Sequence, residues 1–157
     1  SMGKIPLTAV FLLCILPITM GAILAIFTTP YIGAATFAYF LMCFGIYFRK
    51  RRNVLHRWLM IGAIGIDISL VLILEIRRNA IETVIAMDLG PFQLAHVFSS
   101  TLAILIYLPL IALGIRLSKM NNVTVRVWHY RLGILAFLFR SLGFLLMFSL
   151  IERASGL

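Results

Sequence analysis

Long apolar runs constrain this chain more than any other feature of its sequence. Five of them, each 17 to 25 residues long, cover residues 5–27, 32–48, 58–74, 91–115 and 132–151. A helix of about 20 apolar residues crosses the roughly 30 Å hydrocarbon core of a bilayer. Because backbone polar groups must be satisfied within the segment in lipid, we predict an all-α integral membrane protein, a bundle of five transmembrane helices.

The composition fits a chain whose main solvent is the lipid bilayer. Hydrophobic residues make up 62% of the sequence and charged residues only 12%, whereas a soluble domain has about a quarter of its residues charged. The alternative fold has four spanning helices plus a re-entrant or interfacial N-terminal segment. In both cases we expect a single transmembrane domain over residues 1–157.

A cationic cluster between the second and third runs orients the chain. Residues 49–57 hold five of the fourteen Lys and Arg residues. Lys and Arg are retained on the cytoplasmic side during insertion. This orientation places ten of them there, against Arg77, Arg78 and Arg153 outside. We predict a multi-pass protein of the bacterial inner membrane with its N-terminus in and its C-terminus out.

The formal net charge of +9 resides mainly in the loops between the apolar runs. In that position it favours attraction to anionic lipids at the cytoplasmic face of the bilayer. Nucleic acid is therefore not expected as a partner. Between the fourth and fifth runs, residues 116–131 are expected to form a basic polar loop.

Two ionisable residues fall well inside apolar runs, Asp67 in the third and Arg140 in the fifth. An isolated charge at the bilayer centre costs at least about 2.5–3.5 kcal/mol, so each residue needs a partner. We predict a buried ion pair between Asp67 and Arg140. A packing clamp and a proton or ligand site both remain open. The clamp is favoured, because a carboxylate matched by a permanent guanidinium carries protons poorly.

The fourth run carries a polar core stripe at helical spacing, formed by Gln93, His96, Ser100 and Tyr107. Small and polar residues also share the faces of Asp67 and Arg140. Polar faces avoid lipid, so the last three helices are expected to form a polar-core unit over residues 58–151. A helical hairpin over residues 5–48 is expected to pack outside this unit.

The three histidines have two interpretations each. His56 and His129 lie at the inner boundary beside Arg and Trp, which favours anchoring at the interface. His96 lies near the outer edge and is expected to be a hydrogen-bonded core residue. Neutral imidazole also ligates haem iron and copper, which is the alternative for all three. The sequence shows no nucleophile triad, phosphate loop or carboxylate pair, so an enzyme is not favoured.

Three segments resemble the CtaM/YozB-like bacterial membrane proteins over residues 51–151. They are the basic entry Arg51–Met60, the pair Leu94-Ala95-His96 and Tyr107-Leu108-Pro109-Leu110, and Trp128–Gly133. The resemblance implies a small accessory or assembly factor, acting on a respiratory haem–copper oxidase by binding membrane-protein partners in the bilayer. It carries over His56, His96 and His129 as metal or haem positions.

Two other functions remain open at the level of sequence. One is a membrane redox protein that holds b-type haem or handles quinone. The other is a transporter or proton pathway through the Asp67–Arg140 core. The absence of internal repeats disfavours the transporter.

The predicted ion pair can be tested by a double-mutant cycle on stability in detergent. We expect Asp67→Leu and Arg140→Leu each to be destabilising, because the remaining charge is left uncompensated. Breaking a buried pair from one side costs about 3–5 kcal/mol in soluble proteins. A clamp predicts that the double variant recovers much of this loss. Additive losses would show that the two residues are not partners.

Overall fold

The structure is a computed structural model that describes residues 30–79, 82, 85–86 and 90–147. All regular structure in this part of the chain is α-helical, which confirms the predicted all-α class. The four long helices described are α2 (Pro30–Phe48), α3 (Asn53–Arg78), α5 (Pro91–Lys119) and α6 (Val123–Leu146). All four are long and apolar enough to cross a membrane, as expected of an integral membrane protein. The predicted first span, residues 5–27, and the alternative N-terminal segment lie outside the described residues.

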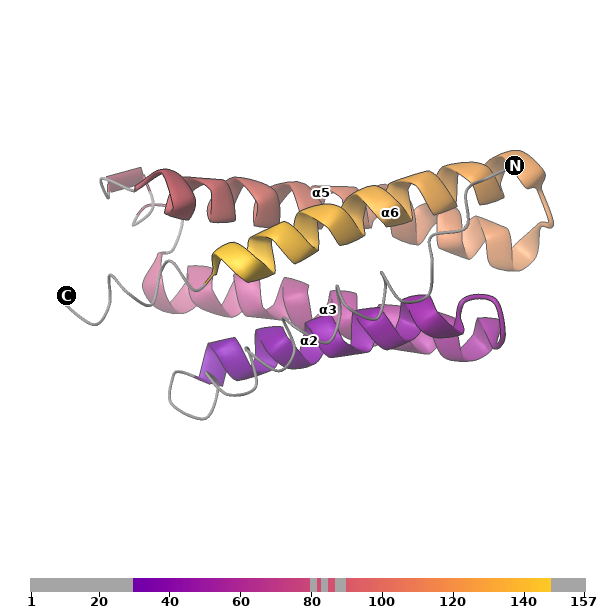
Figure 1. Ribbon diagram of the computed structural model, residues 1–157, viewed down its shortest axis with the longest axis horizontal. Helices are drawn as coiled ribbons and strands as arrows, with labels where there is room; N and C mark the ends of the chain where they lie inside the picture. Colours follow the sequence, from indigo (N-terminus) through magenta and orange to yellow (C-terminus); the bar gives the residue numbers. More distant parts are fainter. Residues whose placement is uncertain (1–29, 80–81, 83–84, 87–89, 148–157) are drawn as a thin grey trace. The chain divides into compact units, whose positions relative to one another are not determined.

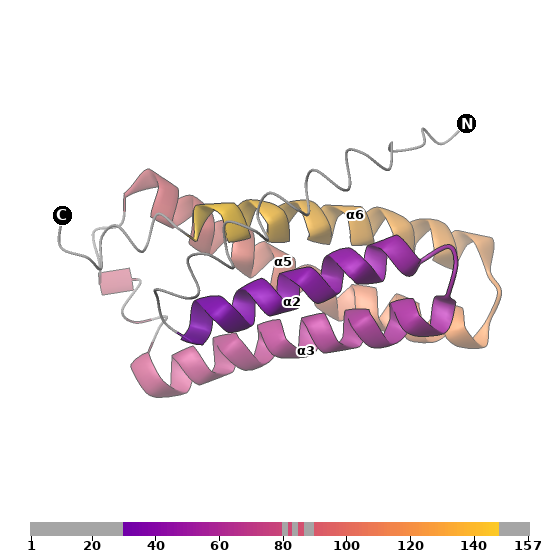
Figure 2. The ribbon, with the colours of Figure 1, turned by 60° about the horizontal axis from the view of Figure 1, so that its bottom comes forward.

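The chain divides into two compact units, residues 1–80 and residues 81–157. In the first unit α2 packs along α3, and in the second α5 packs along α6, so each unit contains an antiparallel helical hairpin (Figures 1 and 2). The predicted polar-core unit over residues 58–151, which would group α3 with the last two helices, stays a prediction.

A tight basic turn joins α2 to α3. The backbone N–H groups of Arg51 and Arg52 donate to the carbonyl oxygen of Phe48, at 3.0 and 2.9 Å. The Arg51 guanidinium lies 5.6 Å from the centre of the Tyr47 ring, a cation–π contact. Helix α3 begins at Asn53, directly after Arg52 and five residues before the predicted span.

Helix α3 ends at an asparagine in the left-handed conformation. Asn79 has φ 43° and ψ 55°, and its N–H donates to the Glu75 carbonyl oxygen at 2.9 Å. Asparagine is one of the few non-glycine residues that adopt this conformation readily. The helix therefore continues four residues beyond the predicted span, which ended at residue 74, and includes Glu75, Arg77 and Arg78.

The predicted basic loop over residues 116–131 is wrong. Helix α5 continues to Lys119 and α6 begins at Val123, so only three residues separate them. Asn122 caps α6, because its side-chain oxygen accepts the N–H groups of Thr124 and Val125 at 2.8 and 3.3 Å. Arg116 and Lys119 occupy the last turn of α5, where cations interact favourably with the helix dipole.

Helices α5 and α6 keep one register along their contact. Three glycines in the contact show this register. A Cβ added at Gly143 would lie nearest to Ser100, one at Gly133 nearest to Leu110, and one at Gly114 nearest to His129. The α5 members of these pairs, residues 100, 110 and 114, are ten and four residues apart. The α6 members, residues 143, 133 and 129, have the same spacing in the opposite direction. The small residues allow the close approach. The register holds across Pro109, through which α5 continues.

The predicted topology can be tested at three exposed asparagines. Asn53 and Asn122 lie at the two hairpin turns, and Asn79 lies at the opposite end of α3. After replacement of Cys14 and Cys43, single cysteines at Asn53 and Asn122 should react with impermeant thiol reagents only in opened cells. A cysteine at Asn79 should react in intact cells. The reverse pattern would show that the chain is inverted.

Candidate functional site

His96 joins the two helices of the second unit through the peptide backbone. Its Nδ1 lies 2.6 Å from the carbonyl oxygen of Gly143 on α6. A carbonyl oxygen only accepts, so Nδ1 is the donor. The same oxygen accepts the N–H of Met147 at 3.0 Å within α6. The imidazole therefore adds a second donor to a carbonyl that already serves its own helix.

Gly143 allows this contact because it has no side chain. A Cβ built there would lie 2.6 Å from Oγ of Ser100 and 3.4 Å from the Ser100 backbone nitrogen. His96 and Ser100 are four residues apart, so they share one face of α5. Two residues of the predicted polar stripe thus meet α6 at one glycine.

His56 forms the equivalent contact in the first unit. Its Nδ1 donates to the carbonyl oxygen of Gly45 on α2, at 2.7 Å. A Cβ at Gly45 would lie 2.8 Å from Sδ of Met60. His56 and Met60 are one turn apart on α3, so both face the glycine. The hydrogen bond ties the first turn of α3 to the last turn of α2, on either side of the basic turn.

His129 also faces a glycine of the neighbouring helix. A Cβ at Gly114 on α5 would lie 3.3 Å from Cε1 of the His129 ring. His129 belongs to α6, so it is a helical residue within a hairpin contact rather than the loop residue that was expected. All three histidines therefore lie against glycines within their own units.

The two hydrogen bonds fix the imidazole tautomer. With Nδ1 donating to a carbonyl, the neutral rings of His56 and His96 carry their lone pair on Nε2. This is the arrangement that metal-binding histidines usually have, since a bond from the other ring nitrogen to a carbonyl orients the ring. Each ring is thus prepared to accept a hydrogen bond or to ligate a metal at Nε2.

The structure does not bring His96 and His129 together. His96 lies at the level of Gly143, fourteen residues along α6 from His129. At 1.5 Å per residue the two rings are about 20 Å apart along the helix, too far to ligate one metal ion. Within the described part of the chain, no three His, Cys, Asp or Glu residues gather into a potential metal site.

The other two residues of the stripe are both buried. Gln93 lies in the first turn of α5, and its side-chain oxygen accepts the N–H of Gly90 at 3.0 Å. It therefore caps the helix, a role that was not predicted from the sequence. Tyr107 is completely buried.

Asp67 and Arg140 are both almost inaccessible, at 6% and 8% exposure. The Arg140 guanidinium lies 5.9 Å from the centre of the Phe144 ring, one turn further along α6. Asp67 belongs to the first unit and Arg140 to the second. Their predicted ion pair stays a prediction.

The sequence did hold a signal for the histidine–glycine contacts. Gly45 lies three residues before the end of α2, and His56 lies three residues after the start of α3. Gly114 lies five residues before the end of α5, and His129 six after the start of α6. In an antiparallel hairpin, residues that lie equally far from the turn, to within about one residue, face one another. With the correct helix ends, the sequence would have predicted the contacts of Gly45 with His56 and of Gly114 with His129.

The close contact at Gly143 predicts a specific pattern of stability. We expect Gly143→Ala to lower stability in detergent by about 1–3 kcal/mol, the usual cost of overpacking. Adding Ser100→Ala should recover much of that loss, because it removes the atom nearest the new methyl group.

Gly65→Ala is the matched control for this substitution. A Cβ at Gly65 meets nothing within 4 Å. Since alanine favours a helix over glycine by up to about 1 kcal/mol, this variant should be neutral or stabilised. Thermal unfolding of the three variants, with the wild type as the reference, measures the pattern. Equal effects of Gly143→Ala and Gly65→Ala would contradict the close approach.

Comparisons with protein-family models, with curated proteins and with solved structures found no match for this chain.

Proposed function

We propose that this protein is a small accessory factor of the bacterial inner membrane that acts by binding a larger membrane protein within the bilayer. The turns at residues 49–52 and 120–122 are too short to hold a binding domain outside the membrane. Among the described residues, recognition then falls to the sides of the helices. We further propose a respiratory haem–copper oxidase, or an assembly intermediate of one, as the partner, on the basis of the resemblance over residues 51–151.

The observation that carries the proposal is an exposed aromatic ridge on α2. The ridge consists of Phe37, Phe40, Phe44 and Tyr47, which are 36% to 55% exposed. Phe40 and Phe44 stack with ring centres 4.4 Å apart. The rings thus form a stiff surface that loses little conformational freedom on binding, and aromatic residues are enriched at protein interfaces.

Lipid alone gives no reason for such a ridge, because aliphatic side chains contact acyl chains equally well. Binding between helices in lipid depends on shape and packing, since burial of apolar surface brings no net gain there. A row of flat, rigid rings presents a more distinctive shape for complementary packing than a row of leucines. The ridge is therefore the surface through which the proposed partner would be recognised.

Deletion of the protein in its native bacterium tests the proposal. We expect oxidase activity and the haem absorption of membranes to fall, and the wild-type protein to restore both. A variant with Phe40→Ala and Phe44→Ala should insert at normal levels but fail to restore them. The control, Leu105→Ala with Leu108→Ala, alters two exposed residues of α5 and should complement fully.

Two results would contradict the proposal. Normal oxidase activity and normal haem spectra in the deletion strain would remove the oxidase as the partner. Complementation by the Phe40 and Phe44 double variant would remove the ridge as the binding surface.

A second candidate function, b-type haem binding, is favoured by the fixed tautomers of His56 and His96. Each ring presents Nε2 in the form that ligates iron. The purified protein should then show a Soret band that is lost in His56→Gln or His96→Gln. A colourless protein, even after addition of haemin, would exclude this function.

A further inference from the structure

The basic turn between α2 and α3 concentrates positive charge without acidic neighbours in the sequence. Lys50, Arg51 and Arg52 are exposed in the turn, and Arg57 is exposed on the first turns of α3. Asp67 is the first acidic residue of the entire chain. The sequence therefore supplies no carboxylate close to these cations.

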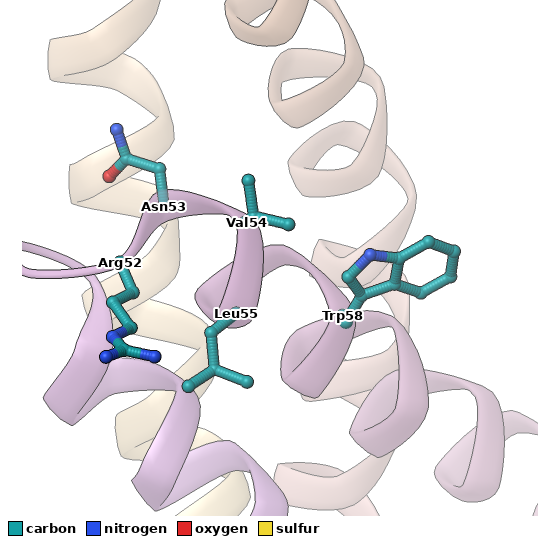
Figure 3. Close-up of a pocket in the computed structure, with 5 residues that line it drawn as sticks. All are labelled: Arg52, Asn53, Val54, Leu55 and Trp58. Atoms are coloured by element: carbon teal, nitrogen blue, oxygen red, sulfur yellow. The ribbon is translucent and has the colours of Figure 1, made fainter.

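An open hollow of about 450 Å³ lies beside this turn (Figure 3). Its lining consists of Arg52, Asn53, Val54, Leu55 and Trp58. In Figure 3 the Arg52 side chain points the same way as Leu55, and Trp58 projects from the next turn of the helix. A cation thus stands at the edge of a surface formed largely by apolar side chains.

We propose that this hollow binds an anionic phospholipid. The phosphodiester would lie against Arg52, and the charge of Lys50 in the same turn would add to the attraction. The upper part of one acyl chain would lie on the apolar part of the lining, Val54, Leu55 and Trp58. Charge complementarity selects the headgroup. The apolar lining explains why a lipid fits better than a free phosphate ion, which gains nothing from contact with these side chains.

Trp58 and the course of the chain support this location. The Trp58 side chain is 67% exposed and lies within the first two turns of a helix that begins directly after Arg52. Tryptophan prefers the headgroup level of a bilayer, where one side of the ring contacts acyl chains and the N–H contacts polar groups. The hollow therefore lies where a lipid headgroup joins its chains.

Quenching of Trp58 fluorescence by brominated lipids tests the proposal on the full chain. Trp128→Phe leaves Trp58 as the sole tryptophan, since the sequence has two. The protein is reconstituted into phosphatidylcholine vesicles that contain brominated phosphatidylglycerol or brominated phosphatidylcholine at equal mole fraction. We expect stronger quenching by the anionic lipid.

Two matched variants separate a site from a general effect of charge. Lys50→Gln with Arg52→Gln removes Arg52, which lines the hollow, and Lys50, which is exposed in the same turn. Arg116→Gln with Lys119→Gln removes two exposed cations elsewhere. A cation near an anionic surface favours binding about fivefold, so the first variant should lower the preference for the anionic lipid at least about fivefold. The second should leave it unchanged.

Three results would overturn the proposal: equal quenching by the two lipids, an unchanged preference in Lys50→Gln with Arg52→Gln, or an equal loss in both double variants. The measurement needs no oxidase or haem. Its outcome is therefore independent of the proposed function.

Discussion

Two helices approach closely in lipid only where their side chains leave room, and in this protein glycines provide that room. Lipid tails are as apolar as leucine, so burial alone does not hold helices together in a membrane. Packing at Gly45 and Gly143 is reinforced by an imidazole that donates to the carbonyl of the same glycine. Close approach and hydrogen bonding thus meet at one residue, and a side chain at that position would disturb both.

Much of the fold was predictable because the apolar runs are long. Four of the five predicted spans correspond to helices in the described residues, and the remaining one, residues 5–27, lies outside them. The helix ends were less predictable. Residues 116–131 are polar, but polarity marks the edge of the hydrocarbon core and not the end of a helix. The residue that fixes the start of α6 is Asn122, whose side chain caps the helix.

The candidate site was predictable as a set of residues and not as a set of contacts. The composition of the runs singled out the three histidines, Asp67 and Arg140. Which glycine each histidine meets depends on helix register, and register depends on turns of three or four residues. An error of a few residues in a helix end moves a side chain to another face. The partner of Asp67 depends in the same way on an arrangement of helices that the apolar runs do not encode.

The hairpin of the first unit has a consequence for the order of folding. His56 and Gly45 are eleven residues apart in sequence, so their bond closes a small loop at little entropic cost. Contacts this local form early, and chains fold from the N-terminus as they are synthesised. The α2–α3 hairpin can therefore close while α5 and α6 are still being made. The order of synthesis, in addition to the bilayer, therefore favours pairing between helices that are neighbours in the sequence.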